Sequence, residues 1–234
     1  MKTISKERKK QLSDDLLIIL LSSVVAPAFF VIFNKEIKQF TENQSIHIVL
    51  RTLIMGLIQF GAAGLGASIV CIFRKESFLK FGLTKKNLIP ALLLSLACCL
   101  PEFIYRLCTG KVERWLPFQG VKLTSEVISS GIPWNILSML IIGLCWGFFE
   151  GFNYVIIRDK LSELLPSKYK YLDWGALICA VMCILIHGAV GATPDAIIEM
   201  LTVIFLIYGM LLVRKLTGNA WGCVLIFFVY WNAV

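Results

Sequence analysis

Long apolar runs alternate with short polar segments along the whole chain. A helix needs about 20 mostly apolar residues to cross roughly 30 Å of hydrocarbon, and the pattern contains seven runs of about this length, near residues 14–33, 48–73, 88–107, 132–157, 171–190, 195–213 and 219–234. This pattern predicts an all-α, polytopic bundle of transmembrane helices with about seven spans, in a single domain covering residues 1–234. The last run is still apolar at Val234, so we expect an eighth span if the natural chain continues.

Composition supports the membrane assignment, and the distribution of charge orients the chain. The 234 residues are 58% hydrophobic, against about 45–50% in ordinary soluble domains. Sixteen of the 23 Lys and Arg residues fall at the N-terminus and in every second connection after it, and seven fall in the others. Such a bias is typical of the positive-inside rule and predicts a cytoplasmic N-terminus. It also accounts for the net charge of +8, so we predict contact with the lipid bilayer and no nucleic-acid partner.

The polar segments and the small residues predict how the spans are connected and packed. Residues 109–131 lack the alternation or apolar face of a separate folded unit, so we expect an outward loop with a short interfacial helix. The connection at 188–195 is very short, which makes the flanking spans antiparallel neighbours. Gly61, Gly64 and Ala67 have the small-residue spacing that lets another helix approach closely.

Ionisable side chains inside the spans each require an explanation, because burying one in hydrocarbon costs about 2.5–3.5 kcal/mol on insertion scales. Arg51 and Glu199 lie near span ends, where an ion pair or an interfacial position is sufficient. Glu102 and Arg106 are four residues apart and are expected to pair along one helix.

Glu150 differs from these groups. It lies in GLCWGFFEGFNYVII, residues 143–157, and the nearest basic residue along the chain is Arg158, eight positions later. Trp146, Asn153 and Tyr154 stand at −4, +3 and +4 from it and would share its helix face. This polar stripe on an apolar helix predicts a cavity lined by these three side chains.

His187 and Asn232 lie in later apolar runs and could act together with Glu150. A lone His in a membrane helix is often a packing residue, but a carboxylate and an imidazole together can deprotonate water and stabilise the resulting oxyanion. Asn232 could add an amide donor, so we select Glu150, His187 and Asn232 as candidate catalytic residues. The expected span boundaries separate Glu150 and His187 by roughly 10 Å in depth, which a shifted boundary, a tilt or a broken helix would have to close.

These residues resemble the motifs of the CPBP family of membrane proteins, which includes CAAX prenyl proteases and bacteriocin-processing (Abi) proteins. Members carry EExxxR on one span, FxxxH on the next and an HxxxN-like motif on a later one. Here FEGFNY keeps one acid, Glu150, and CILIH matches at His187 with Cys183 in place of Phe. GNAWGCVLIFFVYWNAV keeps Asn232 with Phe228 in place of His. The resemblance covers roughly residues 78–234.

The resemblance implies an intramembrane endopeptidase of a bacterial plasma membrane. Glu150 would activate water, and His187 and Asn232 would stabilise the tetrahedral oxyanion. The substrate would be a peptide or protein, such as a bacteriocin precursor or a prenylated-type C-terminus. The second acid, the arginine and the last histidine of the motifs are missing, so the alternative is a weakened or dead relative that serves in bacteriocin immunity or peptide export. A small ion-coupled transporter is a third hypothesis, because lone intramembrane acids also mark proton pathways.

Metal binding is implied by the resemblance but not supported by the ligand count. Members are often described as metalloproteases, yet Glu150 and His187 fall short of the three protein ligands of a catalytic zinc site. We therefore predict no metal, with zinc as the alternative. Cys179, Cys183 and His187 recur every four residues, which would suit a soft metal, but we interpret the two cysteines as small hydrophobes of a membrane helix. The eight scattered cysteines predict no disulfide.

Overall fold

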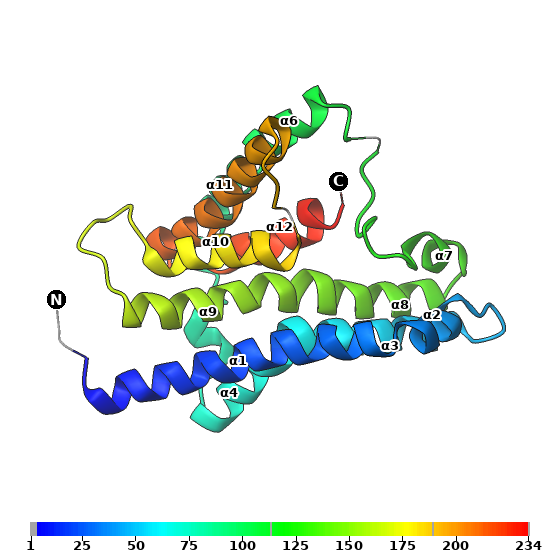
Figure 1. Cartoon of the computed structure of the whole chain (residues 1–234), viewed down its shortest axis with the longest axis horizontal. Helices are drawn as coiled ribbons and strands as arrows, with labels where there is room; N and C mark the ends of the chain where they lie inside the picture. Colours follow the sequence, from blue (N-terminus) through cyan, green and yellow to red (C-terminus); the bar gives the residue numbers. More distant parts are fainter. Residues whose placement is uncertain (1–3, 113, 189, 234) are drawn as a thin grey trace.

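The computed structural model describes residues 4–112, 114–188 and 190–233, and every regular element in these ranges is helical (Figure 1). Five stretches are long and apolar enough to cross a membrane, namely Lys6–Ile32, Ile48–Arg74, Leu88–Cys108, Trp134–Leu164 and Pro194–Thr217. The remaining apolar runs form shorter helices, Trp174–Ile186 and Trp221–Trp231. The all-α fold with several helices long and apolar enough to cross a membrane is thus confirmed, whereas the count of seven spans is not. Val234, where the last predicted run ends, lies outside the described residues.

Most of the long stretches are composites of several helical elements. The first and fifth are single helices, α1 (Lys6–Ile32) and α11 (Pro194–Thr217). The other three contain α3 (Ile48–Phe60), η1 (Gly61–Leu65) and α4 (Gly66–Arg74); α5 (Leu88–Cys98) and α6 (Leu100–Cys108); and α8 (Trp134–Ile142), η3 (Gly143–Phe149) and α9 (Glu150–Leu164). The shorter elements are α2 (Asn34–Glu42), η2 (Phe78–Phe81), α7 (Thr124–Ser129), α10 (Trp174–Ile186), α12 (Trp221–Ile226) and η4 (Phe227–Trp231).

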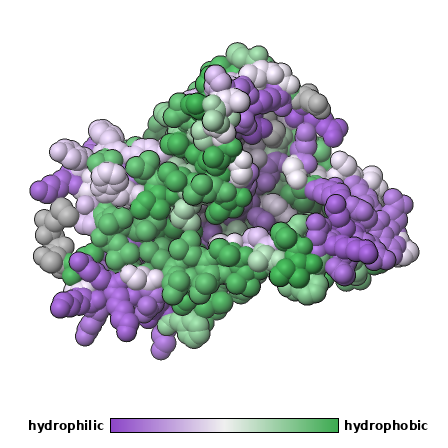
Figure 2. Space-filling model, viewed as in Figure 1, coloured by the Kyte–Doolittle hydropathy of each residue, from purple (hydrophilic) through white to green (hydrophobic). Residues whose placement is uncertain are grey.

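The stretch from α8 to α9 forms the centre of the bundle. On one side it packs against α1 and α3, and on the other against α10 and α12, while α11 and α5 form a tilted pair beyond α10 (Figure 1). Of the 18 most apolar consecutive residues in this stretch, 67% are buried, against 17–39% in the other four long stretches. On the face shown in Figure 2, hydrophobic side chains cover the middle and hydrophilic ones gather at both ends. Glu150 therefore lies on the most enclosed helix of the fold.

The glycine stripe of residues 61–68 brings the second helical stretch close to α1. A Cβ on Gly66 would lie 2.7 Å from Ile19 Cα, and one on Gly61 would lie 2.9 Å from Ala26 Cβ. Neither position leaves room for a larger side chain without moving a helix. The predicted close approach is confirmed at Gly61, where the partner is α1, whereas a Cβ on Gly64 would meet Phe149 of the central stretch at 2.9 Å.

Glu150 and His187 lie at matching depths, so the predicted offset of about 10 Å is wrong. The central helix continues to Leu164 instead of ending at 157, which places Glu150 fourteen residues from its end. Helix α10 begins at Trp174, thirteen residues before His187. At about 1.5 Å per residue both distances are roughly 20 Å. In the sequence, Arg158 and Lys160 look like the start of a polar loop, so the predicted helix ends too early. In the structure, both residues belong to the helix and are buried in ion pairs with acids of other elements.

The segment 109–131 is more ordered than a loop with one short helix. It contains the expected short helix, α7, but it also packs Phe118, Val121, Leu123 and Val127 into a second small core. Its backbone pairs with the C-terminal segment, since the Gly120 N–H donates to the Asn232 carbonyl at 3.1 Å. The expectation that this segment lacks an apolar face is therefore wrong. Its apolar residues are spaced irregularly, so the sequence carries no periodic signal that would predict this core.

The charged residues near the predicted span ends are ion-paired, as expected. Glu102 accepts a hydrogen bond from Arg106 Nε at 2.8 Å, four residues along the same stretch. Arg51 pairs with Glu126 of α7. Lys111 Nζ lies 2.9 Å from a carboxylate oxygen of Glu199. Glu102 and Arg106 pair within one helix, and the other two pairs join different segments, so none of these charges requires a catalytic explanation.

Candidate functional site

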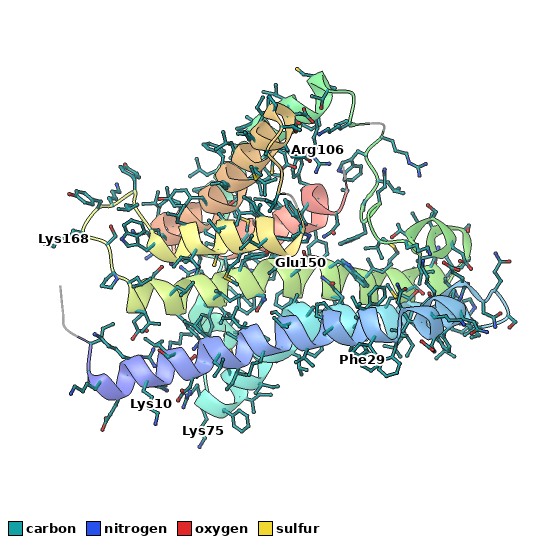
Figure 3. The ribbon with its side chains drawn as sticks, in the orientation of Figure 1. Lys10, Phe29, Lys75, Arg106, Glu150 and Lys168 are labelled. Carbon is teal, nitrogen blue, oxygen red and sulfur yellow. The ribbon has the colours of Figure 1, made fainter. Side chains whose placement is uncertain are left out.

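Glu150 is the first residue of α9 and is 6% exposed. Figure 3 shows it midway along the central helix, at the level where α10 and α12 end. Gln59 Nε2 of α3 donates a hydrogen bond to its Oε2 at 3.0 Å. His187 Nε2 lies 3.7 Å from its Oε1, and the Asn232 amide also lies beside this carboxyl group. The structure thus brings Glu150, His187 and Asn232 together and adds Gln59.

Glu150 has no cationic partner of the usual kind. Among the described residues, no Lys or Arg lies within ion-pair distance of it, and His187 is the one basic side chain that does. Arg158, the nearest basic residue along the helix, instead pairs with Asp159 at 2.6 Å and with Asp173. Glu150 is therefore surrounded by two neutral amides and an imidazole. Each of these groups can contact the carboxyl group without supplying the positive charge of a Lys or Arg.

His187 is positioned by the end of α10. It is the C-cap residue of that helix, and its backbone N–H donates to the Cys183 carbonyl at 3.0 Å. The imidazole packs edge-on against Trp231, with ring centroids 5.2 Å apart. Its side chain keeps 39% of its surface exposed, whereas that of Glu150 keeps 8%. The imidazole therefore stands between the buried acid and the exterior of the protein.

Asn232 is held at the site from two sides. Its side-chain Nδ2 donates hydrogen bonds to the Trp146 carbonyl at 3.3 Å and to the Phe227 carbonyl at 3.4 Å. Its own backbone carbonyl accepts the Gly120 N–H. The segment 109–131, far away in sequence, thus fixes the residue that follows η4.

Three π-helical segments in the described parts of the chain surround this site. Segment η3 ends directly before Glu150, η4 ends directly before Asn232, and η1 begins two residues after Gln59. Hydroxyl groups of α1 bind carbonyls of η1: Ser23 Oγ donates to Ala62 at 2.7 Å. Such segments are rare and occur frequently at functional sites, so their convergence around one carboxyl group marks the site independently of its chemistry.

A cavity of about 150 Å³ lies beside Glu150. Its lining comes from α1, α3, η1, α9, α10 and the cap of α10, and comprises Ser23, Pro27, Gln59, Ala62, Ala63, Glu150, Asn153, Tyr154, Ile157, Met182, Ile186 and His187. The Asn153 side-chain oxygen is buried and has no hydrogen-bond partner among the described atoms. A cavity of this volume with several polar groups on its wall has room for water.

The predicted polar stripe is reproduced in part. Asn153 and Tyr154 line the cavity with Glu150, whereas Trp146 lies outside the lining and packs against the second small core. The reason is η3, because an i→i+5 turn between Trp146 and Glu150 rotates the preceding residues off the α-helical register. Asn232 is likewise not part of the lining and reaches Glu150 from the other side.

Gln59 is the functional residue that sequence reasoning missed. It is the one amide side chain between residues 48 and 73, in an otherwise apolar part of the run. An isolated amide in hydrocarbon needs a partner for the same reason that an isolated acid does. Pairing the two lone polar groups of neighbouring spans would have identified it.

The residues around Glu150 do not fit a zinc ion. A catalytic zinc site needs three protein ligands, and Glu150 has one imidazole and otherwise only amides beside it. Within the described ranges, no three His, Cys, Asp or Glu side chains lie close enough to hold a metal ion. Cys179 and Cys183 are fully buried in the main core, where Cys179 Sγ lies 3.8 Å from the Tyr154 carbonyl.

No family model, no curated protein and no solved structure matches the chain. The resemblance described above therefore depends on the motif residues Glu150, His187 and Asn232. The geometry of these residues is the basis for the function proposed next.

Proposed function

We propose that this protein is an intramembrane endopeptidase of the CAAX protease type, a hydrolase in which Glu150 activates a water molecule. The observation that supports the proposal best is the buried Glu150 carboxyl group with an imidazole 3.7 Å away, two amide donors and a small polar cavity beside it. A position this costly in hydrocarbon is explained if the acid performs chemistry.

In the proposed reaction, a water molecule lies between Glu150 and His187. A separation of 3.7 Å is too long for a direct hydrogen bond, but a water about 2.8 Å from each atom can bridge them. Glu150 takes a proton from this water, and the hydroxide attacks the carbonyl carbon of the peptide bond. The N–H group of His187 stabilises the oxyanion of the tetrahedral intermediate, and Asn232 adds a second donor once its amide turns away from the Trp146 and Phe227 carbonyls. Glu150 then transfers its proton to the leaving nitrogen, and the products are a carboxylic acid and an amine.

Gln59 acts as a positioning residue in this mechanism. Its Nε2 donates to the Glu150 oxygen that does not face His187. This hydrogen bond fixes the rotation of the carboxyl group and leaves the other oxygen directed at the water. Ser23 and the other α1 residues on the cavity wall separate the site from the lipid.

We further propose that α10 and the α12–η4 helix lie within the membrane, which gives seven apolar helices in total. Both pack against the long helices of the bundle. Their lengths of thirteen and eleven residues correspond to roughly 20 Å or less, short of the roughly 30 Å hydrocarbon layer. The Lys and Arg bias supports a cytoplasmic N-terminus, and the family resemblance supports a bacterial plasma membrane.

The second candidate function is a non-catalytic relative that confers bacteriocin immunity or assists peptide export. The size of the cavity favours it, because about 150 Å³ is below the roughly 300–1,000 Å³ typical of ligand pockets. A peptide would enter the site only after α1 or α10 moved. The missing motif residues favour this candidate too.

Substitution of Glu150 by Gln separates the two functions. We expect the purified E150Q protein, in liposomes with a pool of fluorescence-quenched apolar peptides, to cleave at least about 100-fold more slowly than the wild type, since a positioned base contributes about 10²–10⁴. Glu36→Gln, at an exposed acid of α2, is the matched control and should keep full turnover. Equal turnover of E150Q and wild type would refute hydrolysis by Glu150. Survival of a protective effect in cells carrying E150Q would instead favour the non-catalytic role.

A further inference from the structure

A second, strongly charged cavity lies far from Glu150, at the end of the bundle where α1 begins and where α9 and α11 end (Figure 1). Its volume is about 310 Å³. Figure 3 labels Lys10 and Lys168 at this same end. We call it the basal cavity, and its lining is Arg8, Glu76, Lys80, Phe81, Arg158, Asp159, Lys160, Glu163, Arg214 and Lys215.

The charges around the basal cavity do not balance. Six of its lining residues are cationic and three are acidic. Asp15 and Asp173 contact the cluster from outside the lining, and Arg74 pairs with Asp15. With these three residues included, seven cations share five carboxylates, so the cluster has an excess of two positive charges although each cation contacts a carboxylate.

The carboxylates do not satisfy every N–H group around the basal cavity. Arg158 Nε is buried and has no hydrogen-bond partner among the described atoms. Lys215 Nζ donates to the Leu172 carbonyl at 3.0 Å and lies 3.8 Å from the nearest carboxylate, that of Asp173. Lys80 is 57% exposed. An acceptor group entering the cavity would meet the remaining N–H groups of the exposed Lys80 ammonium and a net positive potential.

We propose that the basal cavity binds a phosphate group. The excess of two positive charges suits the one or two negative charges that a phosphate group carries near pH 7, and guanidinium groups suit its oxygens. A lipid headgroup and free phosphate share this chemistry. The position at the end of the bundle, with apolar surface adjoining it, allows a headgroup to enter while its chains remain beside α1. This inference does not depend on the proposed hydrolase function.

Binding can be measured through the stability of the full chain, because a ligand that binds the folded state raises its unfolding temperature. The protein would be purified in neutral detergent, stripped of lipid, and heated with inorganic phosphate or with phosphatidylglycerol in mixed micelles. Sodium chloride at equal ionic strength and phosphatidylcholine are the controls. A rise with phosphatidylglycerol alone assigns a lipid headgroup, and a rise with both assigns phosphate itself. If neither raises the unfolding temperature above its control, the proposal is wrong.

Two opposite substitutions test whether the effect arises in the basal cavity. Glu163→Gln removes one carboxylate and should tighten binding about fivefold, whereas Arg8→Gln with Lys80→Gln removes two cations and should weaken it about 25-fold, at about fivefold per charge. Lys86→Gln, at an exposed position outside the lining, should leave the affinity unchanged. A purely structural network would be weakened by either change, with no opposite shift in affinity. Equal affinities in all variants would overturn the proposal.

Discussion

The basal cavity and the Glu150 site bury charge in opposite ways. At the basal cavity, Lys160 is 3% exposed and binds Asp15 of α1 at 2.8 Å and Glu76 at 3.2 Å. Arg158 likewise binds Asp173, the N-cap of α10. Glu150 is about as deeply buried, but its neighbours are Gln59, Asn232 and an imidazole. One region joins helices through opposite charges, and the other holds an acid whose neighbours are amides and an imidazole, with no Lys or Arg to neutralise it.

The difference shows how to separate structural from functional charge in a membrane protein. A buried ion pair recovers part of its desolvation cost, and breaking it by removing one partner leaves a buried charge unpaired. A lone acid has no such compensation, so its removal should leave the fold intact. Burial alone therefore does not mark an ionisable side chain as functional. Burial without an oppositely charged partner is the feature that marks a candidate. The following predictions test this contrast through stability, from the largest expected change to the smallest.

The largest loss of stability is expected for Lys160→Met. The substitution leaves Asp15 and Glu76 without their shared cation and should lower the free energy of unfolding by about 3–5 kcal/mol. Denaturant titration of the purified protein in detergent would measure it. Adding Asp15→Asn should restore part of the loss, because it removes a buried carboxylate whose one remaining cation is the half-buried Arg74. A loss below about 1 kcal/mol would contradict the role of Lys160 as a joint between helices.

The contribution of Asp173 to the stability of the folded protein should be lost in acid. Burial alone would raise the pKa of Asp173, but hydrogen bonds from Arg158, Ser162 and the Ala176 N–H outweigh it and hold this pKa below its ordinary value. The stability it contributes is therefore present above about pH 4 and is lost as the pH falls through the lower, folded-state pKa. We expect Asp173→Asn to cost about 1.5–3 kcal/mol at pH 7. Unfolding temperatures of both proteins, recorded from pH 7 down to pH 3, should converge; parallel curves would exclude this account.

Arg8→Gln should change stability only slightly. Arg8 and Glu163 lie 2.6 Å apart, but their side chains are 29% and 41% exposed. An exposed pair contributes about 0–1 kcal/mol, and salt screens it. The difference from wild type should shrink further when the unfolding titration is repeated in high salt. A loss as large as that of Lys160→Met would mean that exposure does not govern these pairs.

The smallest effect on stability is expected for Glu150→Gln, although this substitution should have the largest effect on hydrolysis. The amide oxygen of Gln can still accept the hydrogen bond from Gln59, and no cation is left unpaired. We expect the free energy of unfolding to stay within about 0.5 kcal/mol of wild type, measured in the same titration as Lys160→Met. A loss above about 2 kcal/mol would place Glu150 among the structural joints and remove the basis of the proposed function.

Local sequence rules predicted the features that depend on spacing within one segment. Five of the seven apolar runs form helices long enough to span a membrane, Glu102 and Arg106 pair at four-residue spacing, and the glycines near residue 61 lie against α1. Glu150, His187 and Asn232 were selected because they are polar groups in apolar runs, and the structure places them together. Their catalytic roles remain predictions.

The features that the sequence did not predict depend on contacts between distant segments. The central helix extends to Leu164 because Arg158 and Lys160 meet acids from other parts of the chain. Gln59 joins the site through its hydrogen bond to Glu150, which lies 91 residues later in the sequence. The π-helical turns that move Trp146 out of the cavity lining have no periodic signature. Each of these required knowledge of which segments meet.

The shortness of α10 has a consequence for how this protein is made. Thirteen apolar residues are fewer than the roughly 17–25 that enter a bilayer as an independent segment, and the α12–η4 helix is shorter still. During synthesis, α10 would leave the ribosome before the long helix α11 that packs against it. In the proposed topology, in which α10 lies within the membrane, its stable insertion would wait for α11, and these helices would enter the bilayer as a unit. Shortening α11 should then cause misinsertion of α10 before any effect on the finished fold could be observed.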